Sequence, residues 1–137
     1  EFEGKRSEID NLILSPRRIV IIETKNYKGI LEGSVDDIDW KYTKTSAQGN
    51  NYTTTVKNPL KQVKRQTYIL SQILKENNIN CWIDGYLFLH NAKSYIDSDS
   101  ILLNETSLTH KITSSGKDNA LRVEDIQRIK EILKINN

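Results

Sequence analysis

The chain has 137 residues, of which 36% are hydrophobic and 28% charged, and its formal net charge is +2. These values predict one domain, residues 1–137, with its own hydrophobic core, and so small a charge does not by itself indicate a nucleic-acid-binding protein. The longest aliphatic run, Ile19–Ile22, is too short to cross a membrane, and the single cysteine, Cys81, excludes an internal disulfide or a thiolate zinc cluster. We therefore expect a cytoplasmic protein without a membrane partner, and because the chain begins at Glu1 rather than Met we interpret it as a fragment.

Two strands joined by a turn are predicted at the start of the chain. Ile9–Leu14 is largely apolar, Ile19–Ile22 is entirely β-branched, and the segment between them contains Pro16, a residue that type I turns favour. A turn centred just after Pro16 pairs residues whose numbers sum to 33, which sets Asp10 opposite Glu23. The sequence thus predicts two facing carboxylates at one end of a buried strand.

These facing acids lead to our central hypothesis about the chemistry of the chain. Side chains that face each other in an antiparallel pair lie roughly 4.5–5.5 Å apart, and two like charges there favour a cation between them. Lys25 follows Glu23 by two residues and therefore projects from the same face of its strand. Asp10, Glu23 and Lys25 together would hold a divalent metal ion and activate a water. The alternative is that Glu23 and Lys25 are solvated strand-end charges and that Asp10 pairs with an arginine.

The remaining elements are predicted from periodicity and from capping residues. Asn58 and Pro59 are typical of a helix start, and the helix should continue to about Asn77. Thr45–Thr55 is polar and is interpreted as a loop or an irregular hairpin. Further strands are expected at Ile30–Gly33, Ile38–Tyr42, Ile79–His90 (with Gly85 as a candidate bend) and Ile101–Leu103, a helical turn at Glu105–Lys111 and a helix at Val123–Leu133. This order predicts an α/β or α+β fold with a central mixed sheet flanked by helices.

The helix after Asn58 carries two further features. At 100° per residue, Gln62 and Gln66 fall inside its apolar arc. Gln62 lies in the first turn, where it either contacts a phosphate or the acidic cluster or is a core glutamine bonded to backbone. Its polar arc is basic and is countered only by a glutamate at the far end. A basic face that includes an aromatic ring suits a polyphosphate backbone, although such faces are often merely solvated. The basic side chains are Lys61, Lys64, Arg65 and Lys75, with Tyr68 among them and Lys57 just before the cap.

Three segments resemble a known family. They are residues 8–16 (EIDNLILSP), 22–29 (IETKNYKG) and 58–62 (NPLKQ), and they occur in the order found in the nuclease-related domain (NERD) family. The resemblance covers roughly residues 7–103. That family is similar to the PD-(D/E)xK nuclease superfamily, and its members are mainly bacterial. The resemblance implies a restriction-endonuclease-like core, and members usually have a helix before the first strand for which this chain starts too late.

The resemblance also implies roles for individual residues. Asp10 and Glu23 take the places of the metal-binding acids, and Thr24 would add its backbone carbonyl. Lys25 takes the place of the lysine that orients or deprotonates the attacking water, and Gln62 matches the helix glutamine near the cluster and the substrate phosphate. Carboxylate and carbonyl oxygens suit Mg²⁺ or Mn²⁺.

Together these observations predict a metal-dependent nuclease that hydrolyses phosphodiester bonds in nucleic acid, DNA rather than RNA, without a small-molecule cofactor. The side chains expected to contact nucleic acid are Lys28, Lys57, Lys61, Lys64 and Arg65. No base-reading motif is evident, so we expect a preference for shape or for ends rather than for sequence. Two alternatives stay open: a non-catalytic nucleic-acid-binding module and a protein-interaction module with the same fold.

Overall fold

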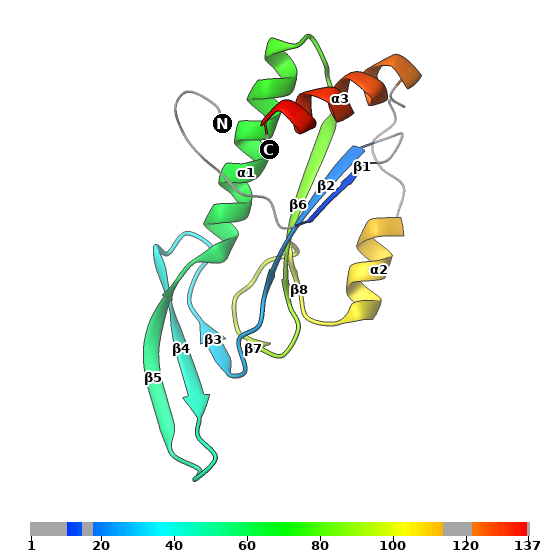
Figure 1. Cartoon of the computed structure of the whole chain (residues 1–137). Helices are drawn as coiled ribbons and strands as arrows, with labels where there is room; N and C mark the ends of the chain where they lie inside the picture. The colour runs from blue at the N-terminus through cyan, green and yellow to red at the C-terminus, as the bar shows by residue number, and fades with distance from the viewer. Residues whose placement is uncertain (1–10, 15–17, 114–121, 137) are drawn as a thin grey trace.

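A computed structural model describes residues 11–14, 18–113 and 122–136 of the chain (Figure 1). Its elements, in chain order, are β1 (Asn11–Leu14), β2 (Arg18–Lys25), β3 (Ile30–Glu32), β4 (Asp39–Thr45), β5 (Asn51–Lys57), α1 (Pro59–Glu76), β6 (Trp82–Leu89), β7 (Lys93–Ser94), β8 (Ile101–Leu102), α2 (Glu105–Thr113) and α3 (Val123–Asn136). The predicted mixed α/β class is confirmed, with two four-stranded sheets in place of one central sheet. Within these residues no helix is long and apolar enough to cross a membrane.

The first sheet has the strand order β1-β2-β6-β8 and holds the centre of the molecule. β2 pairs antiparallel with β1 and parallel with β6, which in turn pairs parallel with β8. The β1–β2 register runs from Asn11 opposite Ile22 to Leu14 opposite Ile19, so the predicted sum of 33 is confirmed for these pairs. Asp10 and the turn at residues 15–17 lie outside the described residues.

The second sheet has the strand order β5-β4-β3-β7 and includes a long hairpin. The segment Thr45–Thr55, interpreted as a loop or an irregular hairpin, is the turn and second strand of the β4–β5 hairpin. Its turn is closed by Ser46, whose backbone N–H donates to the Asn50 carbonyl at 2.8 Å. The hairpin alternative is therefore correct, although the ladder is regular. Six of the seven side chains of β5 are exposed, Val56 being half-buried, so the sequence has no alternating apolar pattern that predicts a regular strand.

Helix α1 begins and ends where the sequence predicts. Its N-cap is Asn58, whose Oδ1 accepts from the Leu60 backbone N–H at 2.9 Å, while its Nδ2 donates to the carbonyls of Val35 and Asp37. One side chain therefore caps the helix and also fixes the β3–β4 connection against it. The helix then packs across the first sheet and leads into β6.

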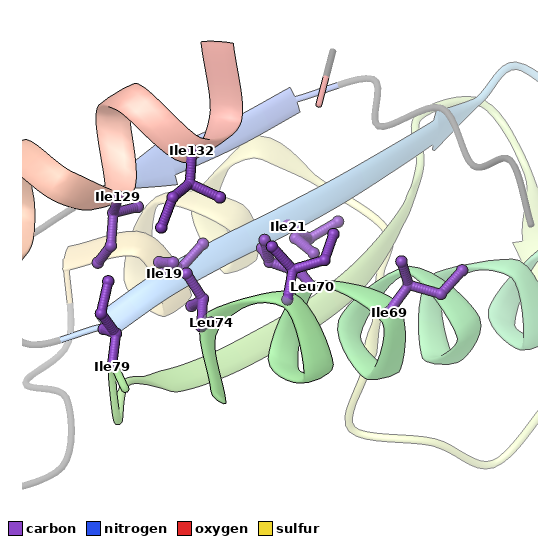
Figure 2. Close-up of a cluster of buried hydrophobic side chains, with 9 residues drawn as sticks. Ile19, Ile21, Ile69, Leu70, Leu74, Ile79, Ile129 and Ile132 are labelled. Carbon is purple, nitrogen blue, oxygen red and sulfur yellow. The ribbon is translucent and has the colours of Figure 1, made fainter. Parts of the chain in front are cut away.

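The hydrophobic core lies between α1 and the first sheet and extends to α3 (Figure 2). β2 contributes Ile19 and Ile21, α1 contributes Leu70 and Leu74 among others, and α3 covers the same end with Ile129. β6 runs without interruption through Gly85, which we had considered a bend. A Cβ atom there would lie 2.5 Å from Val63 Cγ1 and 2.8 Å from Thr67 Cγ2, so the missing side chain lets α1 approach the sheet closely.

Helix α2 covers the opposite face of the first sheet and is longer than the single turn that we expected. Arg18, a buried residue of β2, links this helix to the sheet. Its Nη1 lies 2.6 Å from Asp84 Oδ2 in β6. The same guanidinium donates to the backbone carbonyl of Lys111 in α2. A buried guanidinium satisfied by a carboxylate and a carbonyl ties the helix to β2 and β6.

Candidate active site

The carboxyl end of β2 carries a buried acid beside a lysine. Glu23 is 2% exposed, and its Oε1 lies 3.5 Å from Nζ of Lys25, whose side chain is 35% exposed. Because side chains alternate along a strand, Glu23 and Lys25 project from the face of β2 that carries Ile19 and Ile21. The predicted placement of Glu23 and Lys25 on one face is therefore observed.

The apolar half of this strand shows how β2 meets α1. Ile19, Ile21, Leu70 and Leu74 belong to one buried cluster, and Figure 2 draws Leu74 beside Ile19 and Leu70 beside Ile21. Two strand residues advance about 6.6 Å and four helix residues about 6 Å, so the strand and the antiparallel helix stay nearly in step.

The same spacing, two strand residues for four helix residues, can be continued from the apolar half of the interface into the candidate site. By this spacing Gln66, four residues before Leu70, lies level with Glu23. Gln62, four residues earlier again, lies level with Lys25. Gln66 is 1% exposed, as expected for a side chain held between the helix and the sheet. Gln62 and Lys25 line one pocket. The helix glutamine and the strand lysine, 37 positions apart in the sequence, therefore meet at the same place.

This pocket, of about 480 Å³, is strongly basic and opens where β2 ends and α1 begins. Its charged lining side chains are Lys25, Lys57, Lys61 and Arg65. No carboxylate is among the lining residues in the part of the chain that the structure describes. Four cations around one cavity focus a positive potential, which concentrates anionic groups such as phosphates.

The prediction for Gln62 is wrong in one respect, because this side chain is exposed rather than buried in the apolar arc. Leu60 and Val63 of this part of the helix are buried in one cluster with Leu87 and Leu89 of β6, whereas Gln62 lies on the side of the helix that these residues leave open. Gln66, one turn further along, is covered and buried, as predicted. Exposure gives the Gln62 amide access to a ligand in the pocket.

The other predicted residues are distributed around this centre. Thr24 is exposed on the opposite face of β2, and Lys28 is exposed in the β2–β3 connection. Lys64 lines a second pocket, which also contains carboxylates of Asp84 and Asp99, so it lies apart from the basic pocket. Asp10 lies outside the described residues.

Sequence reasoning missed two residues that line the basic pocket. Tyr27 follows Lys25 by two positions, and this spacing was the signal that would have placed it nearby. Ile38, which the sequence predicts to begin a strand, lies just before β4 and is 75% exposed. An exposed isoleucine at the rim carries no sequence signal, because its role depends on the neighbouring elements.

At the end of β2 the described residues offer one candidate metal ligand. Among them, no group of three or more His, Cys, Asp or Glu side chains is arranged to hold a metal ion. Glu23 is the acid that they contribute at the end of β2, and its hard oxygen atoms suit Mg²⁺ or Mn²⁺, which keep several water ligands.

Comparison with known proteins gives one family. No curated protein and no solved structure matches the chain. The profile of the NERD family, the nuclease-related domain, matches residues 1–90, a range that contains Glu23, Lys25 and Gln62. This match confirms the resemblance seen in the sequence and spans 90 of the 137 residues. The chain belongs to the nuclease-related domain family.

Proposed function

We propose that this domain hydrolyses phosphodiester bonds in nucleic acid, DNA rather than RNA, and that it uses Mg²⁺ or Mn²⁺. The observation that carries the proposal is the position of Lys25. Its ammonium group lies 3.5 Å from the buried Glu23 carboxylate and also lines a pocket with three further cations. A group that can act on a water thus stands next to a site suited to phosphates.

In this proposal the carboxylates of Asp10 and Glu23 would bind the metal ion, and Lys25 would act on the attacking water. The ion would be held by the carboxylates of Asp10 and Glu23 and by the backbone carbonyl of Thr24, as the resemblance to the PD-(D/E)xK nucleases implies. The ion, when bound, would polarise a phosphoryl oxygen and lower the pKa of a water. Lys25 orients that water as an ammonium group, or accepts its proton when it is present as the neutral amine. Gln62, exposed beside Lys25, donates a hydrogen bond to the phosphate.

The basic pocket positions the substrate. Lys57, Lys61 and Arg65 contact phosphates next to the scissile one, and the positive N-terminal end of α1 adds to their attraction. Phosphate contacts fix register without reading sequence, so we expect cleavage with little sequence preference. Lys28 and Lys64, which lie outside this pocket, contribute contacts to more distant phosphates.

The test is a cleavage assay with Mn²⁺ on supercoiled plasmid, linear duplex DNA and RNA. We expect Lys25→Ala to cleave DNA about 10²–10⁴-fold more slowly, the usual contribution of a positioned proton-transfer group. Lys130→Ala, an exposed lysine of α3, is the matched control and should cleave at the wild-type rate. Equal rates for wild type and Lys25→Ala would overturn the proposal.

A second measurement separates catalysis from simple binding. Calorimetric titration with Mn²⁺ should show binding that is lost in both Asp10→Ala and Glu23→Ala. A wild-type protein that binds DNA but neither binds Mn²⁺ nor cleaves would instead be a non-catalytic nucleic-acid-binding module.

A further inference from the structure

The β4–β5 ribbon extends away from the core of the molecule (Figure 1). Its base is anchored, since Trp40 is fully buried and Tyr42 packs against Tyr27 with ring centroids 5.2 Å apart. Beyond Thr43 the strand residues on both faces are exposed, including Lys44 and Tyr52, which is 57% exposed. The outer half of the ribbon therefore contributes little to the hydrophobic core.

The ribbon is nevertheless held in one shape by its own hydrogen bonds. Thr45 Oγ1 donates to Asn51 Oδ1 at 2.8 Å, and the Gly49 backbone N–H donates to the Ser46 carbonyl at 3.0 Å. The ladder is regular over all seven pairs, from Asp39 opposite Lys57 to Thr45 opposite Asn51. An isolated two-stranded hairpin is only marginally stable in water, so an ordered polar ribbon outside the core suits a role in binding.

Apart from Asp39 at the first position of β4, the charge of this region has one sign. Residues 40–75 contain no aspartate or glutamate, and they carry Lys41, Lys44, Lys57, Lys61, Lys64, Arg65 and Lys75. This stretch joins the ribbon to α1 and so to the basic pocket. Within the described chain Lys44 forms no ion pair, and Lys41 lies a loose 3.9 Å from Glu32 with both side chains about half exposed. The ribbon is a cationic surface available to an anionic partner.

The face of the ribbon that carries Tyr42 and Lys44 adjoins the basic pocket. Lys44 pairs with Tyr52 across the two strands, on the same face as Tyr42. Tyr42 packs on Tyr27, and Tyr27 lines the pocket that contains Lys25. A ligand bound at Lys25 that is long enough to pass Tyr27 therefore meets Lys44 and Tyr52.

We propose that the β4–β5 ribbon enters the major groove of B-form duplex DNA whose backbone occupies the basic pocket. The B-form major groove, about 12 Å wide, admits a two-stranded ribbon, and seven residues per strand give the ribbon a length of roughly 24 Å. Lys44 contacts a phosphate at the groove edge, and Tyr52 with the threonines of β5 lies along the groove. The narrow major groove of A-form RNA excludes such a ribbon. The inference rests on the proposed nuclease function and defines its substrate as duplex DNA.

The test measures binding in EDTA, so that cleavage does not enter. Fluorescence anisotropy at several KCl concentrations compares a short duplex DNA with its single strand and with duplex RNA of the same sequence. Wild type should bind duplex DNA most tightly. The Lys44→Ala/Tyr52→Ala variant should bind it more weakly, with the slope of log K against log salt smaller by about 0.9, the value for one phosphate contact. Its affinity for single strands should be unchanged.

Both substitutions are at exposed positions, so the fold should be retained, which circular dichroism will verify. Lys130→Ala on α3 is the charge-matched control and should keep the wild-type slope. The inference would be overturned if the ribbon variant kept the wild-type slope of log K against log salt, or if wild type bound duplex and single strand equally. The proposed nuclease function would still hold in either case, provided that cleavage depends on Lys25. Absence of any nucleic-acid binding would remove both. A change of oligomeric state in the ribbon variant, seen by sedimentation, would show instead that the ribbon contacts a second copy of the chain.

Discussion

At its amino end β2 presents Ile19 and Ile21 to α1, and at its carboxyl end the same face presents Glu23 and Lys25. The helix opposite changes in the same way, from Leu70 and Leu74 to polar residues one and two turns earlier. The backbone arrangement continues through both halves. The candidate site is therefore an extension of the core interface in which polar side chains replace apolar ones.

The two halves contribute to stability in opposite directions. Burying an isoleucine or leucine side chain stabilises a fold by about 1.5–3 kcal/mol. Burying a carboxylate such as Glu23 costs several kcal/mol before its partners are counted. The apolar half thus stabilises the strand and helix on which the polar half depends, and side chains on rigid elements are held more accurately than those on loops.

Exchanging the chemistry of the polar half is the strongest test of this comparison. In Glu23→Leu an apolar side chain like that of Ile21 replaces the buried carboxylate. We expect cleavage to fall by more than about a hundredfold because a proposed metal ligand is lost, since loss of a residue that only supports a ligand already costs about 10–100-fold. We expect the urea midpoint to rise, because a buried charge is replaced by packed hydrocarbon. A lower midpoint would show that Glu23 stabilises the fold and would contradict the comparison.

The apolar half is tested by making a cavity in it. Leu74 is 1% exposed within the cluster that contains Ile19, so Leu74→Ala should lower the free energy of unfolding by about 2–5 kcal/mol. The neighbouring exposed Lys75→Ala should leave it unchanged. Urea unfolding measures both. Cleavage per folded molecule should stay at the wild-type value in Leu74→Ala, and a selective loss of activity would mean that the two halves are coupled.

The success of the sequence-based predictions also differs between the apolar and polar halves of the interface. The β1–β2 register and the start of α1 were predicted because apolar runs and an Asn-Pro cap are local signals. β5 was not assigned as a regular strand because it lacks an apolar face, and Gln62 was placed in the buried arc because helical periodicity does not show which part of that arc a neighbouring element covers. The basic pocket depends on the meeting of β2 with α1, which is a tertiary contact that no local pattern encodes.

The close contact between α1 and β6 lies between the apolar and polar halves of the interface. Substitutions there test how tightly the helix is held against the sheet. Gly85→Ala places a Cβ 2.5 Å from Val63 Cγ1, and such overpacking should lower the free energy of unfolding by about 1–3 kcal/mol. In a Val63→Ala background the same substitution should cost less, because the closer of the two clashing methyl groups is absent and only that of Thr67 remains. Urea unfolding of the four proteins gives the coupling. Additive effects would show that the helix shifts freely and that the close approach is not needed.

The smallest effect concerns Cys81, a half-buried thiol that packs against the apolar cluster next to Ile19. Burial raises the pKa of the Cys81 thiol, because the thiolate is poorly solvated there. The thiolate is the reactive form, so at neutral pH alkylation of the folded protein should be slower than that of the urea-unfolded chain. The folded rate should continue to rise with pH after the unfolded rate has levelled, since the folded thiol loses its proton at higher pH.

The raised pKa of the Cys81 thiol also affects stability. The folded state is favoured while the thiol is protonated and loses this advantage as the pH rises through the folded pKa. Equal pH profiles for the folded and unfolded chains would show that the apolar half is open to water at this position.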